Sequence, residues 1–99
     1  MVWGCDPHTK QILTMFFVYI FKSKKDNDLY IGCTDDLRER FKKHSLGLVP
    51  STKSRLPFVL VYYEAYCSKA DAFKREHNLK LRAKAFAQLK RRIALSIKA

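Results

Sequence analysis

The most regular part of the chain begins with two apolar runs separated by a polar stretch. Residues 16–21 are aromatic and β-branched, a composition that favours a strand. The polar residues 22–28 are typical of a turn, and residues 29–32 return as a second short strand. The pattern therefore predicts a β-hairpin.

A helix is expected directly after this hairpin. Thr34 or Asp35 is a suitable N-cap, and Gly47 is a plausible stop at the other end. Leu37 and Phe41 are four residues apart, so they would share one face of the helix and anchor it to the sheet.

The second half of the chain predicts one more strand and two helices. Residues 58–66 form a near-continuous apolar run, which favours a central strand covered on both faces. Residues 68–71 match a capping box that opens a helix. The apolar stripe expected to face inward on this helix is Ala72, Phe73, Leu79 and Ala83. A second stripe, for a last helix, is Phe86, Leu89, Ile93 and Ile97. The fold class is thus α+β, with a small three-stranded, mainly antiparallel sheet flanked by helices.

One carboxylate falls on the first of these apolar stripes. Glu76 lies three residues from both Phe73 and Leu79. A carboxylate in that position is costly unless it is paired or bound to a cation. The residues alone leave two interpretations open: an ion pair with Arg40 or a lysine, and a metal ligand.

Length and charge indicate one domain with a polyanionic partner. We expect residues 1–14 to be a loose N-terminal head and residues 15–99 to form a single domain that ends in a helix. The 20 Lys and Arg against 9 Asp and Glu give a net charge of +11. Nucleic acid is the first candidate for such a surface and an anionic membrane surface is the second.

Hydropathy and cysteine content indicate the class of protein. No apolar run approaches the ~20 residues of a membrane span. Three cysteines without metal-ligand spacing indicate reduced thiols in a cytoplasmic protein.

The polar segment 48–57 is a candidate phosphate-binding loop. Ser51, Thr52, Lys53 and Arg55 combine hydroxyl groups and positive charge, and Lys43 adds a basic side chain on the preceding helix. An ordinary polar connection explains the same composition, so both interpretations stay open.

Several of these residues recur at spacings that match a known family. Tyr30-Ile31-Gly32 follows Tyr19 by eleven positions and precedes Arg40 by ten, and His44 and Glu76 come later in the same order. This ordered set resembles the GIY-YIG nuclease family, and most closely its small standalone members. Val18 and Tyr19 match the first half of the family motif, but Phe17 stands where the family has glycine.

The resemblance implies a site for phosphodiester hydrolysis. It implies catalytic roles for Tyr19, Tyr30, Arg40, His44 and Glu76. Glu76 would be the ligand of one Mg²⁺ or Mn²⁺ ion, and Arg40 would place two donors on a phosphate. One of the two tyrosines would be the general base, and His44 would relay the proton or contact phosphate. Gly32 would lie against the nucleic acid.

The sequence therefore predicts a metal-dependent endonuclease that cleaves DNA with low sequence specificity, in DNA repair or processing. DNA is favoured over RNA as the substrate, with a protein partner as a source of specificity. The alternatives are a non-catalytic nucleic-acid-binding module with the same fold and, third, a basic adaptor that docks on an acidic protein.

Overall fold

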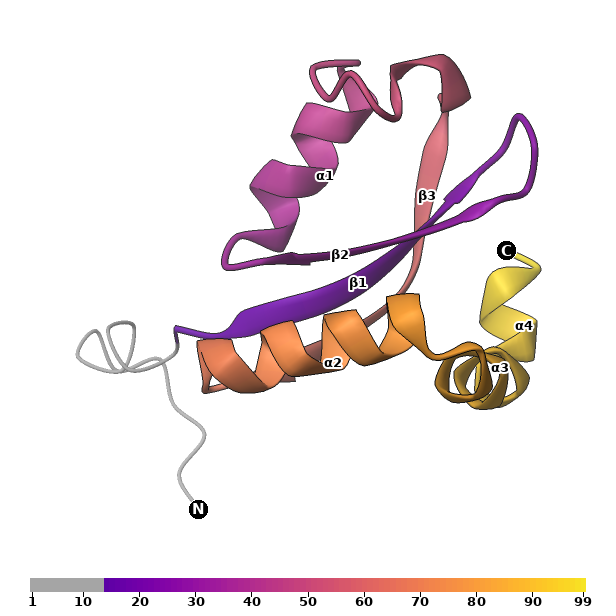
Figure 1. Cartoon of the computed structure of the whole chain (residues 1–99). Coiled ribbons are helices and arrows are strands. Elements are labelled where there is room, and N and C mark those ends of the chain that lie inside the picture. The colour runs from indigo at the N-terminus through magenta and orange to yellow at the C-terminus, as the bar shows by residue number, and fades with distance from the viewer. Residues whose placement is uncertain (1–13) are drawn as a thin grey trace, which may run out of the picture.

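The computed structural model describes residues 14–99 and forms a small sheet between two layers of helices (Figure 1). The strands are β1 (Phe16–Ser23), β2 (Leu29–Thr34) and β3 (Phe58–Tyr66). The helices are α1 (Leu37–Ser45), the short 3₁₀ helix η2 (Lys53–Arg55), α2 (Lys69–Leu81), α3 (Ala83–Arg92) and α4 (Ala94–Ile97). The α+β class is confirmed, whereas the expectation of a loose head falls almost entirely outside the described residues.

The sheet is antiparallel with the strand order β2-β1-β3. The predicted hairpin is confirmed, and the third strand has the predicted bounds. The expectation that this third strand is central is wrong, because β1 lies between its two neighbours. β3 is therefore an edge strand, and its apolar run does not reflect burial on both faces. Leu60 and Tyr63 on one face remain 38% and 53% exposed.

Helices cover the two faces of the sheet unequally (Figure 1). On one face, α1 packs Leu37 and Phe41 against a small core of Tyr19, Phe21 and Phe58. The larger core lies on the other face, under α2, α3 and α4. Its buried members are Val18, Ile20, Ala72, Leu79, Leu89 and Ile93.

Capping residues determine where α1 begins. Its N-cap is Asp36, whose carboxylate accepts a hydrogen bond from the backbone N–H of Glu39, so the prediction of Thr34 or Asp35 is wrong. The reason is that β2 continues to Thr34, whose hydroxyl accepts from the backbone N–H of Asp36 and forms the turn before the helix. Gly47 follows the end of α1 with φ +73°, as a C-terminal glycine does.

After β3 the chain folds into three α-helices rather than two. Ser68 caps α2 as predicted, by accepting from the backbone N–H of Asp71. The predicted inward stripe is only partly correct: Ala72 and Leu79 are buried, but Phe73 is 43% exposed and Ala83 already begins α3.

Lys22 of β1 holds the last helix, α4, since its Nζ donates to the carbonyl of Ile97 at 2.7 Å. None of the helices among residues 14–99 has the length and apolar character needed to cross a membrane.

Candidate active site

A cavity of about 230 Å³ lies where the edge strand β2 meets α1 and α2. It gathers all five predicted catalytic residues from four elements. The lining side chains that come from the prediction are Tyr19 on β1, Tyr30 on β2, Arg40 and His44 on α1, and Glu76 on α2. The fold thus brings together residues that are up to 57 positions apart in the sequence.

Gly32 allows the phenol of Tyr19 to reach this cavity. The two residues are cross-strand partners in β1 and β2. A side-chain carbon on Gly32 would lie 2.9 Å from ring carbon Cε1 of Tyr19 and closer still to its hydroxyl. The absence of a side chain at position 32 is therefore what makes room for the Tyr19 ring.

Arg40 holds the hydroxyl of Tyr19. Its Nε donates a hydrogen bond to that oxygen at 3.2 Å. Burial raises the pKa of Tyr19 above its usual value of 10, while the neighbouring guanidinium of Arg40 works in the opposite direction. In the protein without substrate, Tyr19 is therefore a neutral phenol with a fixed orientation.

His44 is buried beside the same tyrosine. Only 5% of its surface is exposed, and its Nδ1 lies 2.9 Å from the hydroxyl oxygen of Thr52. Burial, with help from the charge of Arg40, lowers the pKa of His44 below its usual value of 6.5. The imidazole is consequently neutral at pH 7.

Glu76 has the cationic neighbour that one interpretation of the sequence expected. Its carboxylate lies 3.3 Å from Nζ of Lys80, one turn later on α2, and its side chain is 13% exposed. Lys80 also lines the cavity. The sequence analysis expected Arg40 or a lysine without naming Lys80, although the four-residue spacing from Glu76 was a usable signal. Among residues 14–99 there is no cluster of three or more His, Cys, Asp or Glu that would hold a metal.

The residues predicted to bind nucleic acid separate into two groups. Gly32, Ser51 and Thr52 line the cavity, whereas Lys43, Lys53 and Arg55 do not. Thr52 is buried, and its hydroxyl contacts His44. Arg55 forms an ion pair at 2.5 Å with Asp26 in the hairpin turn, so this cation is tied to the hairpin.

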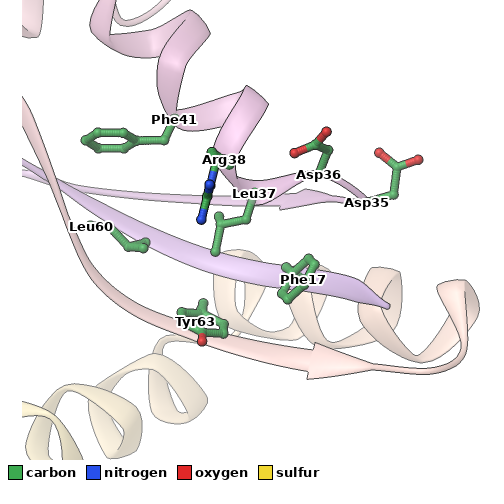
Figure 2. A pocket seen from close by; sticks show the side chains of 8 residues that line it. All are labelled: Phe17, Asp35, Asp36, Leu37, Arg38, Phe41, Leu60 and Tyr63. Atoms are coloured by element: carbon green, nitrogen blue, oxygen red, sulfur yellow. The ribbon is translucent and has the colours of Figure 1, made fainter. Parts of the chain in front are cut away.

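A larger hollow of about 540 Å³ lies on the other side of α1 and contains none of the predicted catalytic side chains (Figure 2). Its walls include Phe17, Leu60 and Tyr63 from the sheet and Phe41 from α1. The ring of Phe17 packs edge-on against Tyr63, with 5.8 Å between ring centroids. The side chain that replaces the motif glycine is therefore accommodated in this hollow, away from the cavity that holds Tyr19.

A second carboxylate, Glu64 on β3, has hydrogen bonds or ion pairs to three neighbouring side chains. Glu64 accepts hydrogen bonds from the hydroxyls of Tyr62 and Tyr66 and pairs with Arg75 of α2 at 2.9 Å. Burial and the carboxylate raise the pKa of both tyrosines to about 12. This cluster joins β3 to α2 and has the character of a structural network.

Comparison with known proteins assigns the family. The family model described as the GIY-YIG catalytic domain matches residues 15–92, which include every residue of the cavity. The chain belongs to the GIY-YIG family. It is 45% identical over 65 residues to a UPF0213 protein of Staphylococcus haemolyticus, a match that covers 65% of this chain and 78% of that protein. The same identity and coverage hold for a UPF0213 protein of Staphylococcus aureus.

A solved structure also resembles this GIY-YIG protein. The solution NMR structure of the UPF0213 protein BH0048 from Bacillus halodurans is 35% identical, with 77% of this chain and 83% of that chain covered and a TM-score of 0.48.

Proposed function

We propose that this GIY-YIG protein is a metal-dependent endonuclease that hydrolyses phosphodiester bonds in DNA. The observation that carries the proposal is the convergence of two tyrosines, an arginine, a histidine and a glutamate on one cavity of about 230 Å³. Hydrolysis of a phosphodiester needs an acceptor for the proton of the attacking water and positive charge near the phosphoryl oxygens. The cavity contains side chains of both kinds.

The donors in the cavity fit magnesium or manganese. Mg²⁺ is commonly bound through one or two carboxylates, with water and substrate phosphate as its remaining ligands. Glu76 supplies one carboxylate, whereas the three or four His and Cys ligands of a zinc site are absent among residues 14–99. Glu76 would hold the ion, which, when bound, would offset negative charge on the phosphate and on the departing oxygen.

Arg40 is the residue we assign to the phosphate. A guanidinium presents several donors in a planar fork that matches two phosphate oxygens. Nε of Arg40 is used by Tyr19, which fixes the orientation of the group. The two terminal nitrogens have no hydrogen-bond partner among the described residues and remain for the substrate.

The general base is assigned to the tyrosine pair without a choice between its members. Tyr19 is buried, and Arg40 supports its hydroxyl as a hydrogen-bond acceptor. Tyr30 is half-buried, and its ring packs edge-on against Phe58 at 5.3 Å. A cation brought in with the substrate would stabilise negative charge on the oxygen of Tyr19 and so oppose the effect of its burial.

The net charge of +11 supports a nucleic-acid substrate and recognition through phosphate. We propose DNA in preference to RNA, low sequence specificity, and a role in DNA repair or processing in which a protein partner adds specificity. Ser51 lines the cavity and is exposed, and Lys43 and Lys53 are exposed on α1 and η2. We propose that these three residues contact the backbone of the nucleic acid. These contacts do not read bases.

A non-catalytic binding module is the second candidate, and the ion pair between Glu76 and Lys80 is the observation that favours it. A carboxylate neutralised by lysine needs no metal. This candidate predicts salt-sensitive binding without cleavage.

A cleavage assay separates the two candidates. Wild-type protein and Glu76→Ala are incubated with duplex, single-stranded and branched DNA and with RNA, in Mg²⁺, Mn²⁺ or EDTA. We expect cleavage of DNA by the wild type with either metal and none by the variant. Glu39→Ala is the matched control, since Glu39 is an exposed carboxylate on α1. Binding without cleavage by the wild type under every condition would favour the non-catalytic module.

A further inference from the structure

The imidazole of His44 has one nitrogen with a partner and one without. Its Nδ1 is 2.9 Å from Oγ1 of Thr52. Its Nε2 is buried and has no hydrogen-bond partner among the described residues. The ring is held edge-on by Phe21 and Phe58, with centroid separations of 5.0 and 5.9 Å. The ring therefore has little freedom to exchange its two nitrogens.

The hydrogen bonds of Thr52 select one tautomer of this ring. The hydroxyl oxygen of Thr52 also lies 3.4 Å from the backbone carbonyl of Val49, to which it donates. A hydroxyl has a single proton, so both contacts are hydrogen bonds only if Nδ1–H of His44 is the donor to Thr52. A neutral imidazole with its proton on Nδ1 carries a lone pair on Nε2.

Hydrogen bonds hold the loop around Thr52 in one conformation. The backbone N–H of Thr52 donates to Val49 at 3.1 Å, and its carbonyl accepts from the N–H of Arg55 at 2.9 Å. The carbonyl of Arg55 in turn accepts from the buried hydroxyl of Ser23 at 2.6 Å. The loop is thus fastened to the hairpin, and Thr52 itself is only 5% exposed.

An unpartnered nitrogen in this place calls for a functional explanation. Buried polar atoms are nearly always hydrogen-bonded, and a catalytic role is one of the recognised explanations for an exception. His44 and Thr52 both line the cavity that contains Tyr19 and Arg40. The lowered pKa of His44 keeps the ring neutral, so the lone pair on Nε2 is available at pH 7.

We propose that Thr52 is a positioning residue, whose hydroxyl keeps the proton of His44 on Nδ1 and leaves Nε2 as a proton acceptor in the active site. The catalytic part of this inference rests on the proposed nuclease function. In that reaction the water oxygen bonds to phosphorus, and the bond from phosphorus to the departing oxygen breaks. The tyrosine that serves as base accepts the proton of the water while its own phenol proton passes to Nε2, which later returns a proton to solvent. The departing oxygen takes up one proton from solvent. Throughout, Nδ1–H continues to donate to Thr52, which stabilises the imidazolium.

Long-range ¹H–¹⁵N NMR spectra of the histidine rings test the tautomer without metal, substrate or activity. The wild type, Thr52→Ser and Thr52→Val are compared near pH 7.5, and His44→Gln assigns the signals among the three histidines. We expect Nδ1–H for His44 in the wild type and in Thr52→Ser, which retains the hydroxyl. In Thr52→Val, which has nearly the same shape, we expect a shift toward Nε2–H. A wild-type spectrum with the proton on Nε2 overturns the proposal, whether or not the valine variant folds.

Cleavage rates test the consequence separately. With DNA and Mg²⁺, we expect Thr52→Val to lose at least about tenfold in rate, since a positioned proton acceptor contributes about 10²- to 10⁴-fold. Thr52→Ser should retain most of the activity. If the valine variant shifts the tautomer and still cleaves at the wild-type rate, the role of Nε2 is wrong. A wild type that cleaves nothing contradicts the proposed function and leaves the tautomer result standing.

Discussion

The phenol ring of Tyr19 occupies the space where a side chain of Gly32, its cross-strand partner, would otherwise lie. The contact places the Tyr19 hydroxyl next to Nε of Arg40 at 3.2 Å. A change at position 32 therefore acts on the site through Tyr19.

We expect Gly32→Ala to abolish cleavage while the protein still folds. The added methyl group overlaps the Tyr19 ring, which is 3% exposed and has little space to move. Overpacking of this kind costs about 1–3 kcal/mol. Urea unfolding gives the stability and a DNA cleavage assay gives the rate.

Gly47→Ala is the matched control for this experiment. Gly47 has φ +73°, so alanine there is strained by roughly 1–2 kcal/mol, but its nearest neighbours are Leu56 and Lys53 at 3.6 Å, away from the cavity. It should lose stability and retain cleavage. Normal cleavage by Gly32→Ala would show that the position of the Tyr19 ring is not critical.

Glu76→Gln should lose cleavage and metal binding while its fold and its affinity for nucleic acid stay largely intact. Glutamine keeps the shape of the side chain but lacks the charge that would hold Mg²⁺. Calorimetric titration with Mn²⁺, thermal unfolding and a DNA-binding assay measure the three properties independently. Undiminished Mg²⁺-dependent cleavage by this variant would remove Glu76 from the site.

Arg40→Lys is expected to reduce the cleavage rate by about 10²-fold or more, the usual cost of removing one oriented donor from a site of charge stabilisation. Lysine retains the charge but lacks the planar fork that can hold the Tyr19 hydroxyl through Nε and present two parallel donors to a phosphate. Arg38→Lys is the control, since Arg38 is on the same helix and lines the larger hollow instead. Near wild-type turnover by Arg40→Lys would mean that a point charge suffices.

Binding to nucleic acid should depend strongly on salt. For about four to six phosphate contacts, log K should fall with log salt at a total slope of roughly −3 to −5. Fluorescence titration of the Glu76→Gln protein without metal, at salt concentrations from about 50 to about 300 mM, gives this slope. Random-sequence DNA should compete almost as well as the labelled strand. A flat salt response, or strong preference for one sequence, would contradict recognition through phosphate.

His44 should make stability fall between about pH 7 and pH 5.5. Its pKa in the folded protein is below the usual value of 6.5, so in this range the unfolded chain binds a proton at residue 44 that the folded protein does not. The free energy of unfolding therefore decreases as the pH falls, by at most about 1.4 kcal/mol per pH unit for one proton.

Urea unfolding of the wild type and His44→Gln at three pH values in this window measures the effect. The variant should be less stable at pH 7 but should lose less stability on acidification. The lowered pKa values of Asp26 and Glu64 affect stability at lower pH, outside the window. Parallel curves for the two proteins would show that His44 is not the titrating group.

The sequence by itself determined most of the local structure and named five residues that line one cavity. Composition and short motifs are local properties. Strand-favouring runs on either side of a polar stretch predicted the hairpin, the apolar run of residues 58–66 predicted the bounds of β3, and the capping box predicted the cap at Ser68. The spacing of Tyr19, Tyr30 and Arg40 named the residues that the fold brings to one cavity.

Only the tertiary structure decided which strand is central and what each side chain contacts. The same apolar run is compatible with a central strand and with an edge strand that has one partly open face. Strand order therefore depends on which strands pair across the sheet, which the sequence does not show. The link from His44 to Thr52 and the contact of Gly32 with Tyr19 join different elements and leave no periodic signal. The same holds for the ion pair of Arg55 with Asp26, because the partner of a charge depends on which segments the fold places side by side.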